Sequence, residues 1–375
     1  DLNGDGHPDL IAVTDQGYVA VYQGLGAEER VEHVLESPYS IYHIMDAQFR
    51  DMDGDVDGDL VMAWNTHDGP VIIFYEFLGF GESTPFVAHS LDVTGMEGLY
   101  QVAIADVSGD GMLDVMSCDN ELGPVVWWES TGAPGAGLFP GAPIVVLQTE
   151  GVLSVAAADM DGDNLPDIVL SLGSELLWFK NEGGGDPSAM FPTESLILVT
   201  TPEGVAPVDL DGDGDMDLLY TDDTKAWGVI QNHGPTAVAS LLAPERDLFT
   251  ASSYSLALHD VDGDGDSDVV FTSESVVRWR ANENGTFPHA AHPLRSIAGN
   301  AFWRAVGDVS GDKLLDIVVD DDALVVFENT GAGGAAAFGN FTTIIAQLYQ
   351  VNAVAIGDYD GDGAMDISMR YSTST

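Results

Sequence analysis

The chain has 375 residues, 45% of them hydrophobic, and a formal net charge of −51 from 62 acidic and 11 basic residues. This charge makes nucleic acid and anionic lipid poor partners. No apolar stretch is long enough to cross a membrane as a helix, so we predict no membrane insertion. The single cysteine, Cys118, excludes an intrachain disulfide, and its apolar surroundings are typical of a buried structural thiol.

The predicted elements recur eight times, about every 50 residues. Each repeat begins with a short alternating strand, such as 101–105, followed by an acidic loop and an apolar strand, such as 167–171. A polar turn leads to a third strand rich in aromatic residues, such as 125–128, and a Gly/Asn turn leads to a weaker fourth strand, such as 342–346. Four short strands in a repeat of this length are typical of a propeller blade. No window shows a helical period, so we expect little helix.

We therefore predict an all-β protein, a single β-propeller domain over residues 1–375 with four-stranded antiparallel blades. The repeats start near residues 1, 42, 99, 152, 203, 253, 301 and 351, and the acidic loop joins strands one and two of each blade. The first repeat lacks its first strand, and the last stops after its second strand. Eight blades, one of them completed by further sequence or by another chain, fit this count better than seven blades with an overhang, which stays open. The incomplete ends also favour a segment of a longer protein.

Two side-chain patterns support the blade assignment. Alanine stands three residues before six loops, where innermost strands crowd a central channel, and Gln48 is the exception. The aromatic residues of the third strands could stack on sugars, but their recurrence at one position favours packing between blades. They are Tyr22, Phe74, Tyr75, Trp127, Trp128, Trp178, Phe179, Trp279 and Phe327.

Each acidic loop reads Asp-x-(Asp/Asn/Ser)-Gly-Asp-x-x-x-Asp. Oxygen-bearing side chains at positions 1, 3, 5 and 9 suit a hard cation such as Ca²⁺. An EF-hand would need a glutamate at position 12 and flanking helices, but position 12 here never carries a metal-binding side chain. We therefore predict up to eight Ca²⁺ ions, one per loop. Numbered in chain order, loops 1 to 8 begin at Asp1, Asp51, Asp106, Asp159, Asp209, Asp260, Asp308 and Asp358.

This pattern resembles the FG-GAP/VCBS family of calcium-loop β-propellers, which includes the integrin α-subunit head and several fungal and bacterial lectins. The resemblance covers essentially the whole chain. It implies that the side chains at positions 1, 3, 5 and 9 bind the metal together with the backbone carbonyl of position 7. The implied ligands of loops 1 to 4 are Asp1, Asn3, Asp5, His7, Asp9; Asp51, Asp53, Asp55, Asp57, Asp59; Asp106, Ser108, Asp110, Met112, Asp114; and Asp159, Asp161, Asp163, Leu165, Asp167. Those of loops 5 to 8 are Asp209, Asp211, Asp213, Asp215, Asp217; Asp260, Asp262, Asp264, Asp266, Asp268; Asp308, Ser310, Asp312, Leu314, Asp316; and Asp358, Asp360, Asp362, Ala364, Asp366.

The loops are not equivalent. Position 6 is expected to be left-handed, which suits Gly or Asn, but loop 2 has Val56 and loop 7 has Lys313 there. Loops 5 and 6 combine five carboxylates with Gly at position 6, so they should hold metal most firmly. Loop 7 should be weakest, because Ser310 replaces a carboxylate and Lys313 is cationic.

Function is less directly encoded. The sequons at Asn284 and Asn340, with loops suited to millimolar calcium, favour a secreted or cell-surface glycoprotein. No histidine is spaced for a nucleophile or a zinc site, and the carboxylates are assigned to metal, so we predict no enzymatic activity and no catalytic residue. We expect an extracellular calcium-binding propeller for adhesion, glycan or protein binding, or assembly of a surface or filamentous structure with copies of itself or other chains.

The alternative is the propeller domain of a carbohydrate-active enzyme of the polysaccharide lyase or sugar dehydratase type. Such an enzyme should interrupt a repeat with a long insertion carrying reactive side chains, and this chain has none beyond a few residues. Partner contacts are expected on the face opposite the calcium loops, where the variable turns include the acidic residues Asp119, Asp222 and Asp321, or along the open edges of the incomplete blade.

Overall fold

The structure is a computed structural model. It describes residues 2–3, 5, 7, 9–13, 19–24, 30–35, 41–99, 101–119, 123–133, 135–149, 151–184, 189–192, 194–197, 201–223, 226–232, 234, 253–273, 276–287, 291–296, 302–320, 323–331, 338–346, 351–358 and 365–371.

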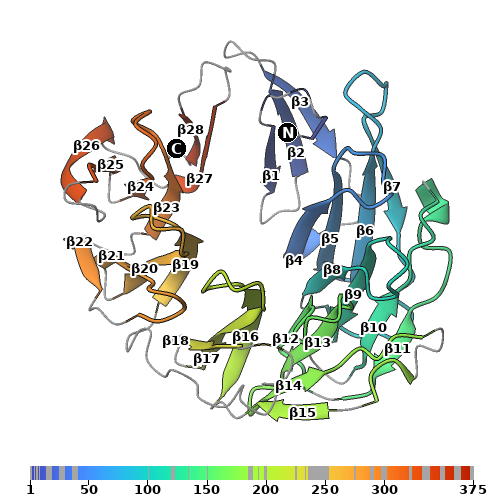
Figure 1. The fold of residues 1–375 in the computed structure, drawn as a ribbon. Helices are drawn as coiled ribbons and strands as arrows, with labels where there is room; N and C mark the ends of the chain where they lie inside the picture. Colours follow the sequence, from blue (N-terminus) through green and yellow to red (C-terminus); the bar gives the residue numbers. More distant parts are fainter. Residues whose placement is uncertain are drawn as a thin grey trace.

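The described strands form separate antiparallel sheets arranged in a ring (Figure 1). Seven sheets have three or four strands, and we number them as blades 1 to 7 in chain order. Blades 1 to 4 are β1 (Leu10–Val13), β2 (Val19–Gly24) and β3 (Arg30–Leu35); β4 (Ile41–Arg50), β5 (Asp59–Thr66), β6 (Gly69–Phe77) and β7 (Phe86–Ser90); β8 (Val102–Ala105), β9 (Asp114–Cys118), β10 (Val125–Trp128) and β11 (Ile144–Leu147); and β12 (Ser154–Ala158), β13 (Asp167–Ser171), β14 (Leu176–Phe179) and β15 (Glu194–Ile197).

Blades 5 to 7 are β16 (Pro202–Val208), β17 (Asp217–Asp222) and β18 (Trp227–Ile230); β19 (Ser253–His259), β20 (Asp268–Ser273), β21 (Val276–Arg280) and β22 (His292–Ser296); and β23 (Phe302–Gly307), β24 (Asp316–Asp320), β25 (Ala323–Asn329) and β26 (Phe338–Ala346). A further two-stranded sheet, β27 (Val351–Gly357) and β28 (Asp366–Tyr371), lies between blade 7 and blade 1 in the ring (Figure 1).

The predicted all-β propeller of antiparallel blades is confirmed. Helical structure within the described residues is limited to the 3-10 turn η1 (Gly135–Gly137). Both blade numbers that the sequence left open remain compatible with the sheets, because seven have three or four strands and β27–β28 adds a two-stranded eighth. Among the described residues, no helix is long and apolar enough to cross a membrane.

The core lies between neighbouring blades. Trp127 of blade 3 and Phe179 of blade 4 belong to one buried cluster, and Phe74 of blade 2 and Trp128 of blade 3 belong to the next. Of the nine aromatic residues noted in the third strands, eight are at most 6% exposed, so their assignment to packing is confirmed. Tyr22 is half-buried, and its hydroxyl donates a 3.0 Å hydrogen bond to Glu32. Truncation of such a buried aromatic side chain typically costs about 3–5 kcal/mol.

The innermost strands also behave as predicted. The alanines expected near the channel lie on the first strand of their sheets, as Ala103 does on β8 and Ala156 does on β12. Gln48, the exception, lies on β4 and donates a 2.7 Å hydrogen bond to the carbonyl oxygen of Val102 on β8 of the next blade. A long polar side chain at this position therefore links two blades where alanine would only fill space.

Candidate calcium loops

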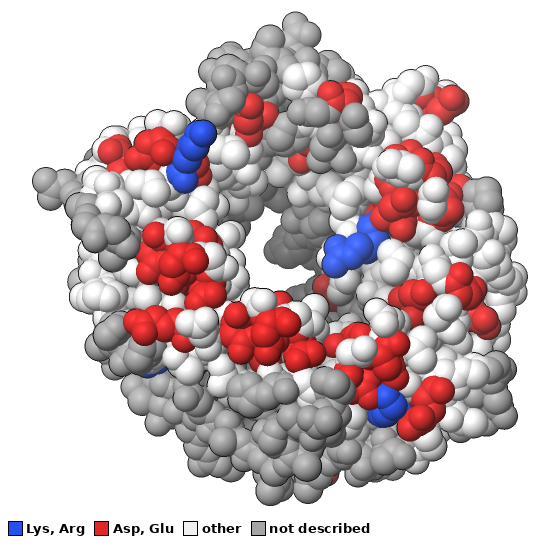
Figure 2. Space-filling model, in the orientation of Figure 1, with Lys and Arg blue, Asp and Glu red and all other residues white. Residues whose placement is uncertain are grey.

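Loops 2 to 7 each lie between the first two strands of their sheet. The aspartate at position 9 is the first residue of the second strand, as Asp59 is of β5 and Asp167 is of β13. Figure 2 shows acidic side chains gathered in separate patches around the central opening, as expected for one acidic loop per blade.

The carboxylate at position 1 accepts two backbone hydrogen bonds from residues of its own loop. In loop 4, Asp159 Oδ1 accepts the backbone N–H of Gly162 at 2.8 Å, and Asp159 Oδ2 accepts that of Asn164 at 2.7 Å. The same pair of bonds recurs in loops 2, 5, 6 and 7. Both accepted groups belong to residues with positive φ, which allows their N–H groups to point inward.

The predicted left-handed conformation at position 6 is confirmed in loops 2 to 7. It occurs at glycine in loops 3, 5 and 6, but also at Val56 (φ 81°), Asn164 (φ 69°) and Lys313 (φ 73°). Asparagine tolerates this region, whereas a β-branched side chain is strained there. Loop 2 therefore retains the loop geometry at a conformational cost.

Position 9 has a structural role that the sequence did not predict. Asp167 Oδ2 accepts the N–H of Met160, and Asp167 Oδ1 accepts the N–H of Asn181, which follows the third strand. Equivalent pairs of bonds hold Asp59, Asp114, Asp217, Asp268 and Asp316, all 0% exposed. Desolvation raises the pKa of Asp167 to about 6 even though these hydrogen bonds lower it.

Position 3 carries the clearest sign that the loops suit a cation. Asp53, Asp161 and Asp262 each have a buried Oδ1 atom without a hydrogen-bond partner, and so does Asp57 at position 7 of loop 2. Desolvation, followed by the charges of neighbouring aspartates, raises the pKa of Asp53 and Asp262. A buried carboxylate oxygen without a partner is costly, so these atoms fit a cation that accepts oxygen ligands.

Ligand atoms of three carboxylates lie within 4.8 Å of one another in four of the described loops. These clusters are Asp51, Asp53 and Asp59; Asp159, Asp161 and Asp167; Asp209, Asp211 and Asp213; and Asp260, Asp262 and Asp268. An all-oxygen set of this kind suits Ca²⁺ better than zinc or copper, which favour nitrogen and sulfur. The donor set therefore fits the predicted metal.

The remaining predicted ligands are placed as follows. At position 7, His7, Asp57, Met112, Leu165, Asp215, Asp266 and Leu314 each donate their backbone N–H to the aspartate at position 5. The structure gathers no three-carboxylate cluster among the described residues of loops 3 and 7, where Ser108 and Ser310 occupy position 3. Asp1, Asp360, Asp362 and Ala364 lie outside the described residues.

An asparagine that the sequence did not single out joins adjacent loops. Asn181, Asn232, Asn282 and Asn329 are at most 1% exposed, and each follows the third strand of its blade or ends it. Their Nδ2 groups donate to the carbonyl oxygen at position 2 of the preceding blade's loop, at 2.6–2.9 Å. The signal that could have identified three of them is the repeated Asn-x-Gly at 181–183, 232–234 and 329–331.

Other predicted positions have mixed outcomes. Cys118 is a free, buried thiol as expected, and burial raises its pKa to about 12. Asn284 is exposed beside loop 6, where its backbone N–H donates to Asp266, while the side chain of Asn340 lies outside the described residues. Asp119, which was expected on a variable turn available to a partner, is 1% exposed and accepts the backbone N–H groups of Glu97 and Gly98. Asp321 lies outside the described residues.

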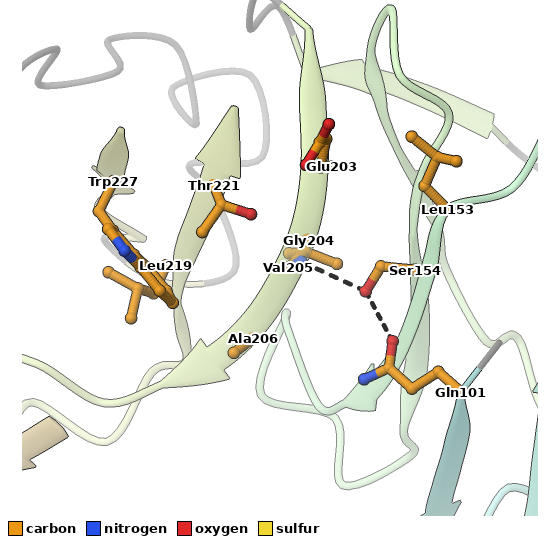
Figure 3. Close-up of a pocket in the computed structure, with 10 residues that line it drawn as sticks. All are labelled: Gln101, Leu153, Ser154, Glu203, Gly204, Val205, Ala206, Leu219, Thr221 and Trp227. Carbon is orange, nitrogen blue, oxygen red and sulfur yellow. Dashed lines mark hydrogen bonds between the residues drawn. The ribbon is translucent and has the colours of Figure 1, made fainter. Parts of the chain in front are cut away.

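A pocket of about 320 Å³ lies beside the innermost strands of blades 4 and 5 (Figure 3). At its wall, Ser154 Oγ donates to Gln101 Oε1 at 2.8 Å and accepts the N–H of Val205 at 3.3 Å, so that blades 3, 4 and 5 are linked. Glu203 and Trp227 also line the pocket. It presents an acidic, an amide and an aromatic side chain around one hollow.

Comparison with known proteins agrees with this architecture. The FG-GAP-like repeat matches residues 1–62, 106–170 and 260–319, about half of the chain. Together with the propeller and its repeated loops, this shows that the chain belongs to the FG-GAP repeat family of β-propellers. A search of curated proteins finds no significant match.

Among solved structures, an Agrocybe aegerita lectin is similar over 96% of both chains, with a TM-score of 0.56 and 18% identity. That lectin specifically recognises non-reducing terminal N-acetylglucosamine. The Photorhabdus luminescens Tc holotoxin pore matches 90% of this chain and 17% of its own, with a TM-score of 0.34 and 15% identity. At these identities the likeness to the lectin shows the fold alone, and the likeness to the holotoxin carries no argument.

Proposed function

We propose that this protein is a non-catalytic, extracellular propeller that is stabilised by calcium and binds a glycan. The observation that supports the calcium part is the set of buried Oδ1 atoms without partners in Asp53, Asp161 and Asp262. Each belongs to a cluster of three carboxylates at the closure of a strand pair. When bound, calcium would supply the positive charge that offsets the mutual repulsion of these carboxylates.

The ligand is proposed from the architecture and its relative. The similar fungal lectin recognises a terminal amino sugar, and the likeness covers 96% of both chains. A propeller offers a rigid frame on which turns and inter-blade hollows vary without disturbing the core. The pocket of Figure 3 has side chains suited to a sugar, since Trp227 offers an apolar ring and Glu203 and Gln101 offer polar atoms.

Extracellular placement is supported by the two sequons and by the loop chemistry. Asn284 is exposed on the calcium-loop side, where a glycan would not disturb the core. Loops of this kind suit extracellular calcium, which is held near the millimolar range.

The test has two parts. Calcium-stripped protein should melt at a markedly lower temperature than calcium-loaded protein, and added Ca²⁺ should restore the melt, because the ion counters the repulsion in each loop. Calcium-loaded protein should then bind selected sugars on a glycan array. An unchanged melt after verified metal removal contradicts the calcium part, and an array without reproducible binding contradicts the glycan part.

A further inference from the structure

Loop 4 contains a cation of its own. Lys180 directly follows strand β14, and its ammonium group donates hydrogen bonds to Asp161 Oδ2 and, at 2.7 Å, to Asp163 Oδ2. These carboxylates occupy positions 3 and 5 of the loop. The side chains of Lys180 and Asp161 are only 25% and 11% exposed, so this is not a fully solvated surface pair.

The lysine is particular to this blade. Lys180 immediately precedes Asn181, whose backbone N–H donates to the aspartate at position 9 of loop 4. In each other blade, the equivalent residue is the one that immediately precedes the corresponding N–H donor. Its counterparts elsewhere are Gln23, Glu76, Glu129, Gln231, Ala281 and Glu328. None of them is cationic.

We infer that Lys180 is a tethered cation that competes with calcium for loop 4. The inference rests on the proposal that the loops bind calcium. A divalent ion at the carboxylate cluster of Asp159, Asp161 and Asp167 would lie beside a fixed positive charge and would have to displace two charge-assisted hydrogen bonds. Loop 4 has aspartate at positions 1, 3, 5 and 9, as loops 5 and 6 do, but its affinity is lower for this reason.

The same contact stabilises the loop when calcium is absent. The ammonium group offsets the repulsion between Asp161 and Asp163. In loops 5 and 6, no lysine or arginine among the described residues forms such an ion pair with the loop carboxylates. One oxygen, Asp161 Oδ1, still has no partner, so the lysine satisfies the cluster only in part. Loop 4 therefore depends less on calcium than loops 5 and 6 do.

Gln231, the counterpart of Lys180 beside loop 5, allows a reciprocal pair of substitutions. Lys180→Gln removes the tethered cation, and Gln231→Lys introduces one at the equivalent position before Asn232. Both variants are purified in calcium and compared with the wild type by two measurements. One is the number of ions retained at limiting free calcium, from native mass spectrometry and chelator competition. The other is the melting temperature of the calcium-stripped protein.

Lys180→Gln should bind calcium about tenfold more tightly at one site and retain one more ion, while its calcium-stripped form melts below the wild type. Gln231→Lys should retain one ion fewer and melt higher when stripped of calcium. A Lys180→Gln variant that folds only in calcium also supports the inference. If the wild type binds calcium and Lys180→Gln changes neither measurement, the inference is wrong while the proposed function stands. A wild type that binds no calcium overturns both.

Discussion

Asn232 Nδ2 donates a 2.7 Å hydrogen bond to the carbonyl oxygen of Met160, which lies in the acidic loop of the preceding blade. The same amide donates to Met216 of its own loop at 3.2 Å, and its backbone N–H donates to Asp217 at 2.7 Å. One side chain, 1% exposed, thus holds two neighbouring loops in fixed relation. Any cation bound in one loop is thereby coupled mechanically to the next blade.

Asn232→Ala should destabilise the calcium-loaded protein by about 2–3 kcal/mol, because it leaves buried carbonyl groups of two loops without donors. Urea unfolding would measure the change. Gln231→Ala is the neighbouring control, since its side chain makes only a 3.5 Å contact to the Asn284 carbonyl and should cost within about 0.5 kcal/mol. Equal losses in the two variants would refute the role of the asparagine.

Val56→Gly should stabilise the protein by about 1 kcal/mol. Val56 has a φ of 81° and is 87% exposed, so its side chain adds strain and has little packing to lose. Val145→Gly is the control on a strand, because Val145 is 49% exposed on β11 and its replacement should destabilise by up to about 1 kcal/mol. Opposite signs in denaturant unfolding are expected, and a loss in both variants would count against strain at Val56.

The calcium-stripped protein should lose stability as the pH rises. Burial raises the pKa of Asp59 and Asp268 to about 7, and that of Asp114, Asp167 and Asp217 to about 6. In the unfolded chain the pKa of each of these groups is about 3.9. Between about pH 4 and 7 the folded state therefore holds more protons than the unfolded state. The stabilisation from these protons is complete below about pH 4 and is lost as the pH passes through 6 to 7.

Calorimetry of calcium-stripped protein between pH 4 and 8 would measure this dependence. Saturating calcium should flatten or reverse the decline, because the ion binds the ionised carboxylates. A melting temperature that rises from pH 5 to 7.5 without calcium would contradict the burial of these aspartates.

The sequence was sufficient for features that depend on repetition. The period near 50 residues predicts the propeller, and glycine at position 6 of several loops predicts the positive φ of Val56 and Lys313 by analogy. Contacts between repeats were not predictable in this way. The partner of Asn232 lies 72 residues earlier in another blade, and the amide that holds it has no local signature of its target.

The direction of individual side chains was the second feature that could not be predicted from the sequence. A polar turn predicts exposure, yet Asp119 turns inward to satisfy two backbone N–H groups. The contact of Lys180 with Asp161 and Asp163 requires the end of the third strand to lie over the loop, which only the folded blade shows. Metal affinity ranked from loop composition alone therefore omits a cation contributed from outside the loop.

Loops 3 and 7 allow the composition rule to be tested on its own. Both have serine at position 3, but position 6 is Gly111 in loop 3 and Lys313 in loop 7. Lys313 is exposed with a φ of 73°, so it adds both a positive charge and backbone strain. We expect loop 3 to bind calcium more tightly than loop 7, and loops 5 and 6 to bind it more tightly than both.

Ser310→Asp should raise the calcium affinity of loop 7 about tenfold, and Ser310→Asp with Lys313→Gly should bring that affinity close to that of loop 6. Crystals grown at limiting calcium would give the occupancy of each loop from anomalous scattering. Full occupancy of loop 7 with empty loops 5 and 6 would contradict the ranking.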